Sequence, residues 1–127
     1  MDSNELKNRT QQFAISVIKF TDELPKTRAS DVLGKQLLRS ACSVGANYRS
    51  ACRAQSYAHF VSKINIVEEE SDESLFWLEL LLKTKMINEE KIKPLIKEAN
   101  ELTAIFTATK KTSRINIEKK KNLKSKI

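Results

Sequence analysis

The stretch that decides the fold is LLRSACSVGANYRSACRAQSYAHF, residues 37–60. Leu37, Ala41, Val44, Tyr48 and Ala51 recur at spacings of three and four, which is typical of an amphipathic helix. The same stretch contains two cysteines, one glycine and several serines, so an active-site helix, a metal site and a packing surface are all conceivable. The small side chains favour packing, because they let a neighbouring helix approach closely and accumulate dispersion contacts.

The cysteines and the histidine of this stretch do not form a site. Cys42 and Cys52 are ten residues apart on one expected helix, which is about 15 Å along its axis. A disulfide needs Cα atoms within about 7 Å, and the spacing does not suit zinc, so we expect buried, reduced thiols. The single histidine, His59, lacks the glutamate three residues earlier that di-iron bundles use. We therefore predict no metal, no cofactor and no enzymatic activity.

Helical periodicity continues on both sides of this stretch and predicts four helices, with no strand. Pro25 ends the first helix, because proline disfavours a helical conformation in the residue before it. The expected helices are residues 3–22, 30–53, 57–86 and 89–109. The expected N-caps are Ser3, Thr27 or Ser30, Ser56 and Asn88.

Short links join these helices, and short links make consecutive helices antiparallel. The links are residues 23–29, 54–56 and 87–88. The predicted fold class is therefore all-α, an antiparallel up-down-up-down four-helix bundle formed by residues 1–109. Residues 110–127 are expected to be a basic, frayed C-terminal extension.

The net charge of +7 lies entirely in that extension. Residues 1–109 contain 15 basic and 15 acidic residues, whereas residues 110–127 contain eight basic residues and only Glu118 as an acid. A basic segment on a neutral body indicates an anionic partner such as RNA or DNA; a disordered, solubilising end is the alternative. The extension has no aromatic residue for base stacking. The candidate nucleic-acid-binding residues are Arg49, Arg53, Lys110, Lys111, Arg114, Lys119, Lys120, Lys121, Lys124 and Lys126.

The second half of the third expected helix is apolar around almost its whole circumference. A helix of this kind needs burial on several sides, and a lone bundle covers only one side of each helix. The surplus apolar surface predicts a contact between copies of the chain. The candidate interface residues are Leu75, Phe76, Trp77, Leu80 and Leu81.

Opposite charges on the second and third helices predict an ion pair between them. Residues 30–53 carry a net charge of +3 and residues 57–86 a net charge of −3. A hairpin that turns near residues 54 and 55 places Arg39 opposite Glu70. We therefore expect Arg39 to pair with Glu70 or Glu73, with a solvated acidic face as the alternative.

No apolar run reaches the roughly 18 residues that a membrane span needs, and the N-terminus has no apolar signal segment. The sequence therefore predicts a cytoplasmic protein with no membrane partner.

Several ordered motifs resemble a bacterial family of four-helix-bundle proteins, some of which are encoded in intervening sequences of large-subunit ribosomal RNA genes. The resemblance covers about residues 5–109. In this family Asn is often followed by Ile-Ala-Glu-Gly, whereas this chain continues with Tyr48, so roles of that glutamate and glycine do not carry over. The motifs are Arg39-Ser40-Ala41, Ser43-Val44-Gly45-Ala46-Asn47, Phe60, Glu68 to Glu73, and Trp77-Leu78-Glu79.

The resemblance implies a protein without enzymatic activity that forms homopentamers. A related branch serves as an accessory subunit beside a reverse transcriptase and contacts nucleic acid. Two hypotheses follow for this chain. It is either a homo-oligomeric, nucleic-acid-associated accessory protein, or a protein-interaction scaffold, for example for a reverse transcriptase, that binds no nucleic acid itself.

Overall fold

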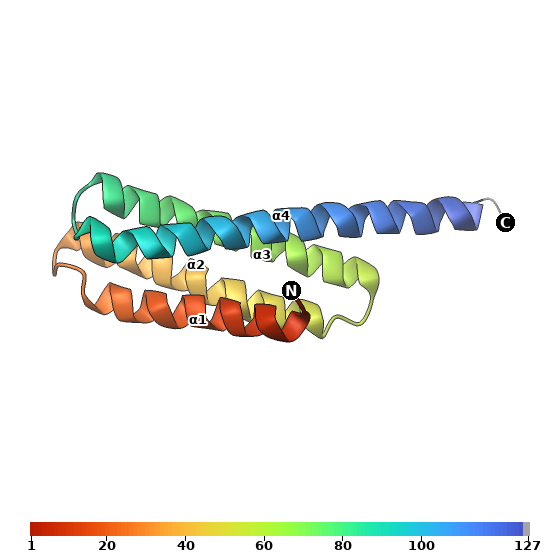
Figure 1. The fold of residues 1–127 in the computed structure, drawn as a ribbon, viewed down its shortest axis with the longest axis horizontal. Coiled ribbons are helices and arrows are strands. Elements are labelled where there is room, and N and C mark those ends of the chain that lie inside the picture. Colours follow the sequence, from red (N-terminus) through yellow and green to blue (C-terminus); the bar gives the residue numbers. More distant parts are fainter. Residues whose placement is uncertain (126–127) are drawn as a thin grey trace.

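The computed structural model describes residues 1–125, with side chains through Lys124, and shows an all-α bundle of four helices. Each helix lies antiparallel to the next along the chain, and α1 also borders α4 (Figure 1). No strand occurs among the described residues. The predicted fold class is confirmed. The helices are α1, Ser3–Asp22; α2, Arg28–Cys52; α3, Tyr57–Lys83; and α4, Glu89–Ser125.

Side-chain caps fix the starts of the first three helices. The expected cap Ser3 is wrong, because Asp2 precedes the helix and its Oδ1 accepts a hydrogen bond from Glu5 N at 2.8 Å. Thr27 and Ser56 cap α2 and α3 in the same way. A hydrogen bond of this kind satisfies one of the amides that a helix start leaves unpaired.

The third helix ends earlier than its sequence pattern suggests. It stops at Lys83 rather than near Met86, because Lys85 adopts a left-handed conformation with φ of 56°. A residue in this conformation just after a helix ends it and redirects the chain.

The fourth helix is longer than expected, and its predicted end near Thr109 is wrong. It continues to Ser125 and projects beyond the rest of the bundle (Figure 1). Residues 110–125 contain no glycine or proline, and lysine is a good helix former. We call residues 110–125 the α4 extension.

The core lies between the four helices and follows the predicted stripes. Thr10 is buried with the apolar residues of α1, as the spacing of three and four predicts. Across the bundle, the rings of Tyr48 and Phe106 lie 5.4 Å apart between centroids, within the range in which aromatic pairs stabilise a core. The fully buried large apolar side chains are Leu37, Ile64, Leu78, Leu81, Ile92, Leu102, Phe106, Val17, Val44 and Val67.

The small residues of α2 contact two helices rather than one. Ser74 Oγ on α3 donates to Ser40 Oγ at 2.9 Å, and both residues are buried. Gly45 instead faces α1, where a Cβ atom built on it would lie 3.5 Å from Thr10 O. The expectation that both cysteines are buried is also wrong, since Cys42 is exposed. Packing is nevertheless the main role of this stretch.

Replacing Gly45 with alanine should raise the stability of the protein. The new methyl group would make an ordinary van der Waals contact with α1, and alanine favours a helix interior over glycine by about 1 kcal/mol. We expect an increase of about 0.5–1 kcal/mol in the free energy of unfolding, measured by urea denaturation. A loss of stability would show that the two helices tolerate no Cβ here.

Candidate nucleic-acid interface

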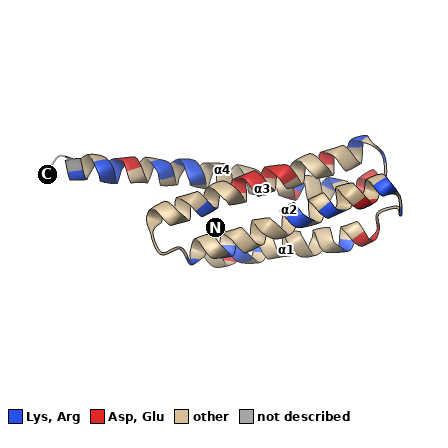
Figure 2. Cartoon of the chain, turned by 180° about the vertical axis from the view of Figure 1, so that it is seen from behind, with Lys and Arg blue, Asp and Glu red and all other residues tan. Residues whose placement is uncertain are grey.

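The α4 extension presents cations on a helix that leaves the bundle. Figure 2 shows basic residues gathered along this projecting part, with the acidic residues concentrated on α3. Lys111, Arg114, Lys119 and Lys124 are all exposed. Exposed cations held on one helix suit the phosphates of a nucleic acid, because each contact releases counterions.

One basic residue of the extension is held inside the bundle instead. The Lys110 ammonium forms an ion pair with Glu68 of α3, and the two side chains are only 21% and 16% exposed. Lys110 Nζ also lies 3.5 Å from Asn65 Oδ1. Burial raises the pKa of Glu68, but hydrogen bonding from Lys110 and Thr107 and the charges of Lys110 and Arg114 outweigh it, so this pKa falls below its usual value. Lys110 therefore joins α4 to α3.

Tyr57, the first residue of α3, supports the base of the projecting helix. Its hydroxyl accepts a hydrogen bond from Asn116 Nδ2 at 3.3 Å, and Lys120 Nζ lies 5.0 Å from its ring centroid. Hydrogen bonding with Ser113 and Asn116 lowers the pKa of Tyr57. These contacts explain why the helix stays ordered past the expected boundary.

A pair of aromatic rings accompanies the cations at this end of the bundle. Tyr57 and Phe60 stack with centroids 6.0 Å apart and an interplanar angle of 19°. Both line an open cavity of about 520 Å³ together with Tyr48, Gln55 and Ser56. The extension itself has no aromatic residue, but the fold places these rings beside it. Proteins that bind single-stranded nucleic acids combine aromatic rings, on which bases stack, with cations that contact the phosphates.

The remaining predicted basic residues lie in different places. Arg53 is the exposed C-cap of α2. Arg49 lines a groove between α1 and α2. Lys120 is over the Tyr57 ring and Lys121 is exposed. Lys126 lies outside the described residues.

The predicted oligomer residues on α3 differ in exposure. Phe76 is 55% exposed, and its ring meets Trp77 edge-on with centroids 4.9 Å apart. Leu75, Trp77 and Leu80 are half-buried. The assignment of Leu81 is wrong, because this residue is fully buried in the core of its own chain. Phe76 is thus the most exposed apolar residue of the predicted set.

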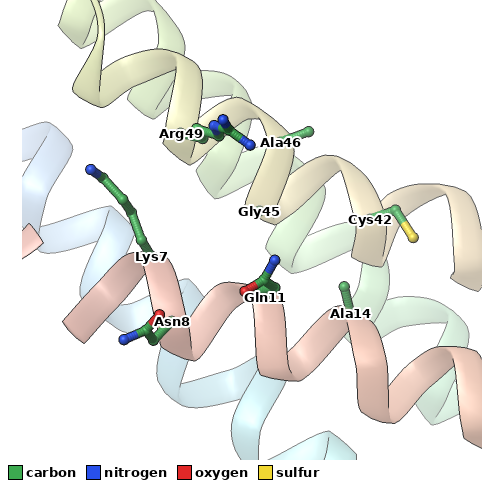
Figure 3. A pocket seen from close by; sticks show the side chains of 8 residues that line it. All are labelled: Lys7, Asn8, Gln11, Ala14, Cys42, Gly45, Ala46 and Arg49. Atoms are coloured by element: carbon green, nitrogen blue, oxygen red, sulfur yellow. The ribbon is translucent and has the colours of Figure 1, made fainter. Parts of the chain in front are cut away.

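The groove between α1 and α2 has a cationic end and a small-residue end (Figure 3). Its volume is about 420 Å³. Lys7 and Arg49 lie at one end, and Ala14 and Cys42 line the other. Asn8, Gln11, Gly45 and Ala46 complete the lining. No carboxylate lines this groove among the residues that the structure describes.

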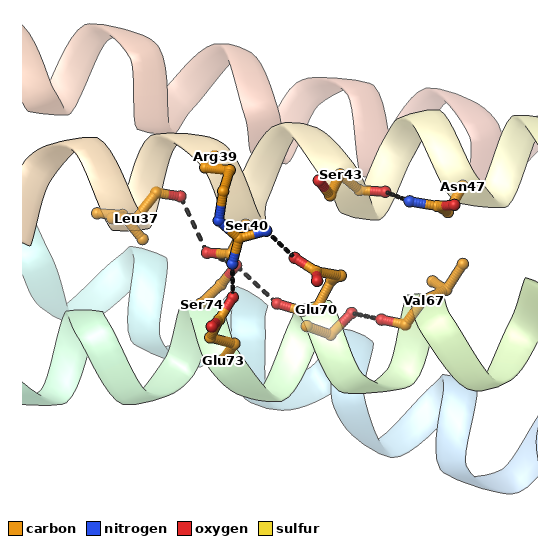
Figure 4. Close-up of polar contacts among 10 residues, drawn as sticks. Leu37, Arg39, Ser40, Ser43, Asn47, Val67, Glu70, Glu73 and Ser74 are labelled. Carbon is orange, nitrogen blue, oxygen red and sulfur yellow. Dashed lines mark hydrogen bonds and ion pairs between the residues drawn. The ribbon is translucent and has the colours of Figure 1, made fainter.

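Arg39 bridges α2 and α3 as the charge pattern predicts (Figure 4). Its Nη1 lies 3.1 Å from Glu70 Oε2, and its Nη2 contacts Glu73. The Arg39 side chain is 48% exposed, so the pair sets the register between the helices more than it adds stability. Asn47, in the same stretch, donates to Ser43 O at 2.9 Å and is satisfied within its own helix.

Residues 2–108 match the family described as 23S rRNA-intervening sequence protein. The chain belongs to this family. A crystal structure of an S23 ribosomal-protein-family member of unknown function from Bacteroides thetaiotaomicron VPI-5482 superposes with a TM-score of 0.79 at 34% identity. The match covers 87% of this chain and 99% of that chain. No curated protein matches the sequence.

The family match ends at residue 108, so the whole α4 extension lies beyond it. Within the described residues, no group of three or more His, Cys, Asp or Glu side chains is placed to hold a metal ion. No helix in that part of the chain is long and apolar enough to span a membrane.

The sequence alone did not indicate three residues of this surface, Tyr57, Phe60 and Lys7. The apolar spacing of α3 includes Tyr57 and Phe60 and predicts that both pack in the core, whereas the structure leaves both partly exposed at the start of the helix. No sequence pattern identifies Lys7 as part of this surface, because it lines the same groove as Arg49 only when α1 packs against α2. The basic composition near residues 110–125 and the candidates Arg49 and Arg53 could be recognised from the sequence alone.

Proposed function

We propose that this member of the family is a homo-oligomeric, non-catalytic protein that binds single-stranded RNA through the α4 extension. The observation that carries the proposal is the continuous helix that holds exposed lysines and Arg114 beyond a bundle of zero net charge. An ordered helix keeps these cations together, so less conformational freedom is lost on binding than with a disordered tail.

The aromatic pair beside the extension supports a single-stranded ligand. Tyr57 and Phe60 offer ring surface within reach of the lysine-rich helix. Stacking of a base on an aromatic side chain contributes about 1–3 kcal/mol, and bases in a duplex cannot reach such a surface. The family description, which refers to ribosomal RNA, makes RNA the ligand to test first.

Self-association would multiply weak contacts with RNA. The exposed Phe76 on α3 supports an interface between copies, and we propose the pentamer that the family resemblance implies. Five chains of net charge +7 together carry a net charge of +35. Several extensions on one assembly would bind a single RNA with greater avidity than one extension.

Neutralising three exposed lysines of the extension should weaken RNA binding in a salt-dependent way. The variant Lys111→Gln/Lys119→Gln/Lys124→Gln loses three candidate phosphate contacts. Because each contact to single-stranded nucleic acid contributes about 0.7 to the slope of log K against log salt, we expect the slope to become shallower by about 2. Fluorescence anisotropy with oligouridylate between about 50 and 200 mM salt measures it.

A matched control distinguishes the effect of losing lysines from the extension from the effect of lowering the net charge. The variant Lys19→Gln/Lys26→Gln/Lys83→Gln also removes three exposed lysines, from the end of α1, the α1–α2 link and the end of α3. These segments lie at the end of the bundle opposite the extension (Figure 1). It should bind oligouridylate as the wild type does. Equal weakening in both variants would show that binding follows net charge alone. Absence of binding by the wild type at about 50 mM salt would contradict the proposal and favour a protein-interaction scaffold.

A further inference from the structure

We infer that α3 of one copy docks in the α1/α2 groove of a second copy, with Phe76 over the small-residue end and Glu69 beside Lys7 and Arg49. The inference specifies the surfaces of the proposed self-association and rests on it. Phe76 is the exposed part of an aromatic pair with Trp77. The groove is open, and its lining includes Ala14, Cys42, Gly45 and Ala46.

Charge complementarity selects a second copy as the occupant. The outer face of α3 carries Glu69, Asp72 and Glu79 around Phe76, at helical spacings of seven, four and three residues from it. The groove carries Lys7 and Arg49 and no carboxylate among the described residues. Within that part of the chain, none of these five charged side chains has an ion-pair partner. Each surface thus supplies the charges that the other lacks.

The spacing along the helices also matches. Lys7 precedes Ala14 by seven residues on α1, and Arg49 follows Cys42 by seven residues on α2. On α3, Glu69 precedes Phe76 by the same seven residues. Seven residues make about two helical turns, or about 10 Å, and return to nearly the same face. When Phe76 lies at the small-residue end, Glu69 therefore reaches the cationic end.

The match sets the direction of the docked helix. Glu69 precedes Phe76 on α3, just as Lys7 precedes Ala14 on α1. Docked α3 is therefore parallel to α1 of the other copy. Within one chain α1 and α3 also run in the same direction (Figure 1). Both copies therefore point the same way. Phe76 projects from α3, whereas the groove lies between α1 and α2, so each copy contributes a different surface to the contact. Such a head-to-tail contact allows assemblies larger than dimers.

Sedimentation velocity of the full-length protein tests this interface. We expect the wild type to form a species larger than a dimer, and Phe76→Ala to weaken association by about 30-fold, as for a central aromatic at an interface. Leu123→Ala is the matched control, because Leu123 is an apolar residue that is 64% exposed on the α4 extension rather than on α3. It should change association by less than about 2-fold.

A charge swap tests the orientation. Arg49→Glu and Glu69→Arg should each weaken association on the order of tenfold at low salt, and the double variant should recover most of the loss. Failure of the double variant to recover would overturn the proposed pairing. A wild-type dimer would overturn the head-to-tail arrangement. If Phe76→Ala leaves the oligomer unaffected, the result contradicts this interface but not the proposed self-association. A monomeric wild type would contradict both.

Discussion

Replacing Leu102 with alanine is expected to lower the free energy of unfolding by about 2–5 kcal/mol. Leu102 lies in the middle of α4 and is fully buried. The truncation removes apolar contacts and leaves a cavity that the surrounding helices can only partly fill. Guanidinium denaturation followed by circular dichroism measures the change, with the midpoint shifting while the slope stays constant.

Leu123→Ala provides the matched control on the same helix. Leu123 is 64% exposed on the α4 extension, so the same chemical change should alter stability by no more than about 0.5 kcal/mol. Comparable losses in the two variants would mean that the extension packs against another surface in solution. The pair therefore tests whether α4 has a buried half and a projecting half.

The spacing of apolar residues was sufficient to predict most of the bundle. The spacing of three and four places Thr10 among the buried residues of α1, and a hairpin that turns near residues 54 and 55 brings Arg39 opposite Glu70. Both results follow from local periodicity and a short link, which restrict the possible pairings of neighbouring helices. Periodicity could not decide which side of an almost wholly apolar helix faces inward. Leu81 was for this reason assigned to the surface although it is buried.

The candidate nucleic-acid surface was harder to predict, because it depends on contacts between distant segments. The extension has no strong apolar stripe, so periodicity predicts that the fourth helix ends near residue 109. Its order depends on Lys110 meeting Glu68 and on Asn116 and Lys120 meeting Tyr57. These pairs are 42 to 63 residues apart in sequence, and only the packed structure brings them together.

Replacing Lys110 with methionine should destabilise the protein by about 1–3 kcal/mol near neutral pH. Methionine has a similar length but no charge, so it would leave the largely buried Glu68 carboxylate without its ammonium partner. In the wild type the pKa of Glu68 lies below its usual value of 4.5. Its ionised form therefore stabilises the fold above that pH, and this contribution is lost as the pH falls through the lower folded-state pKa.

The pH dependence distinguishes this ion pair from a simple packing effect. Without Lys110 the pKa of Glu68 should rise, since burial disfavours its charged form. The stability difference between wild type and Lys110→Met should then shrink between about pH 7 and about pH 3.5. Lys111→Met is the control, because Lys111 is exposed and adjacent; we expect a change below about 0.5 kcal/mol at either pH. A Lys110→Met deficit that stayed constant on acidification would show that the aliphatic chain, rather than the charge, joins α4 to α3.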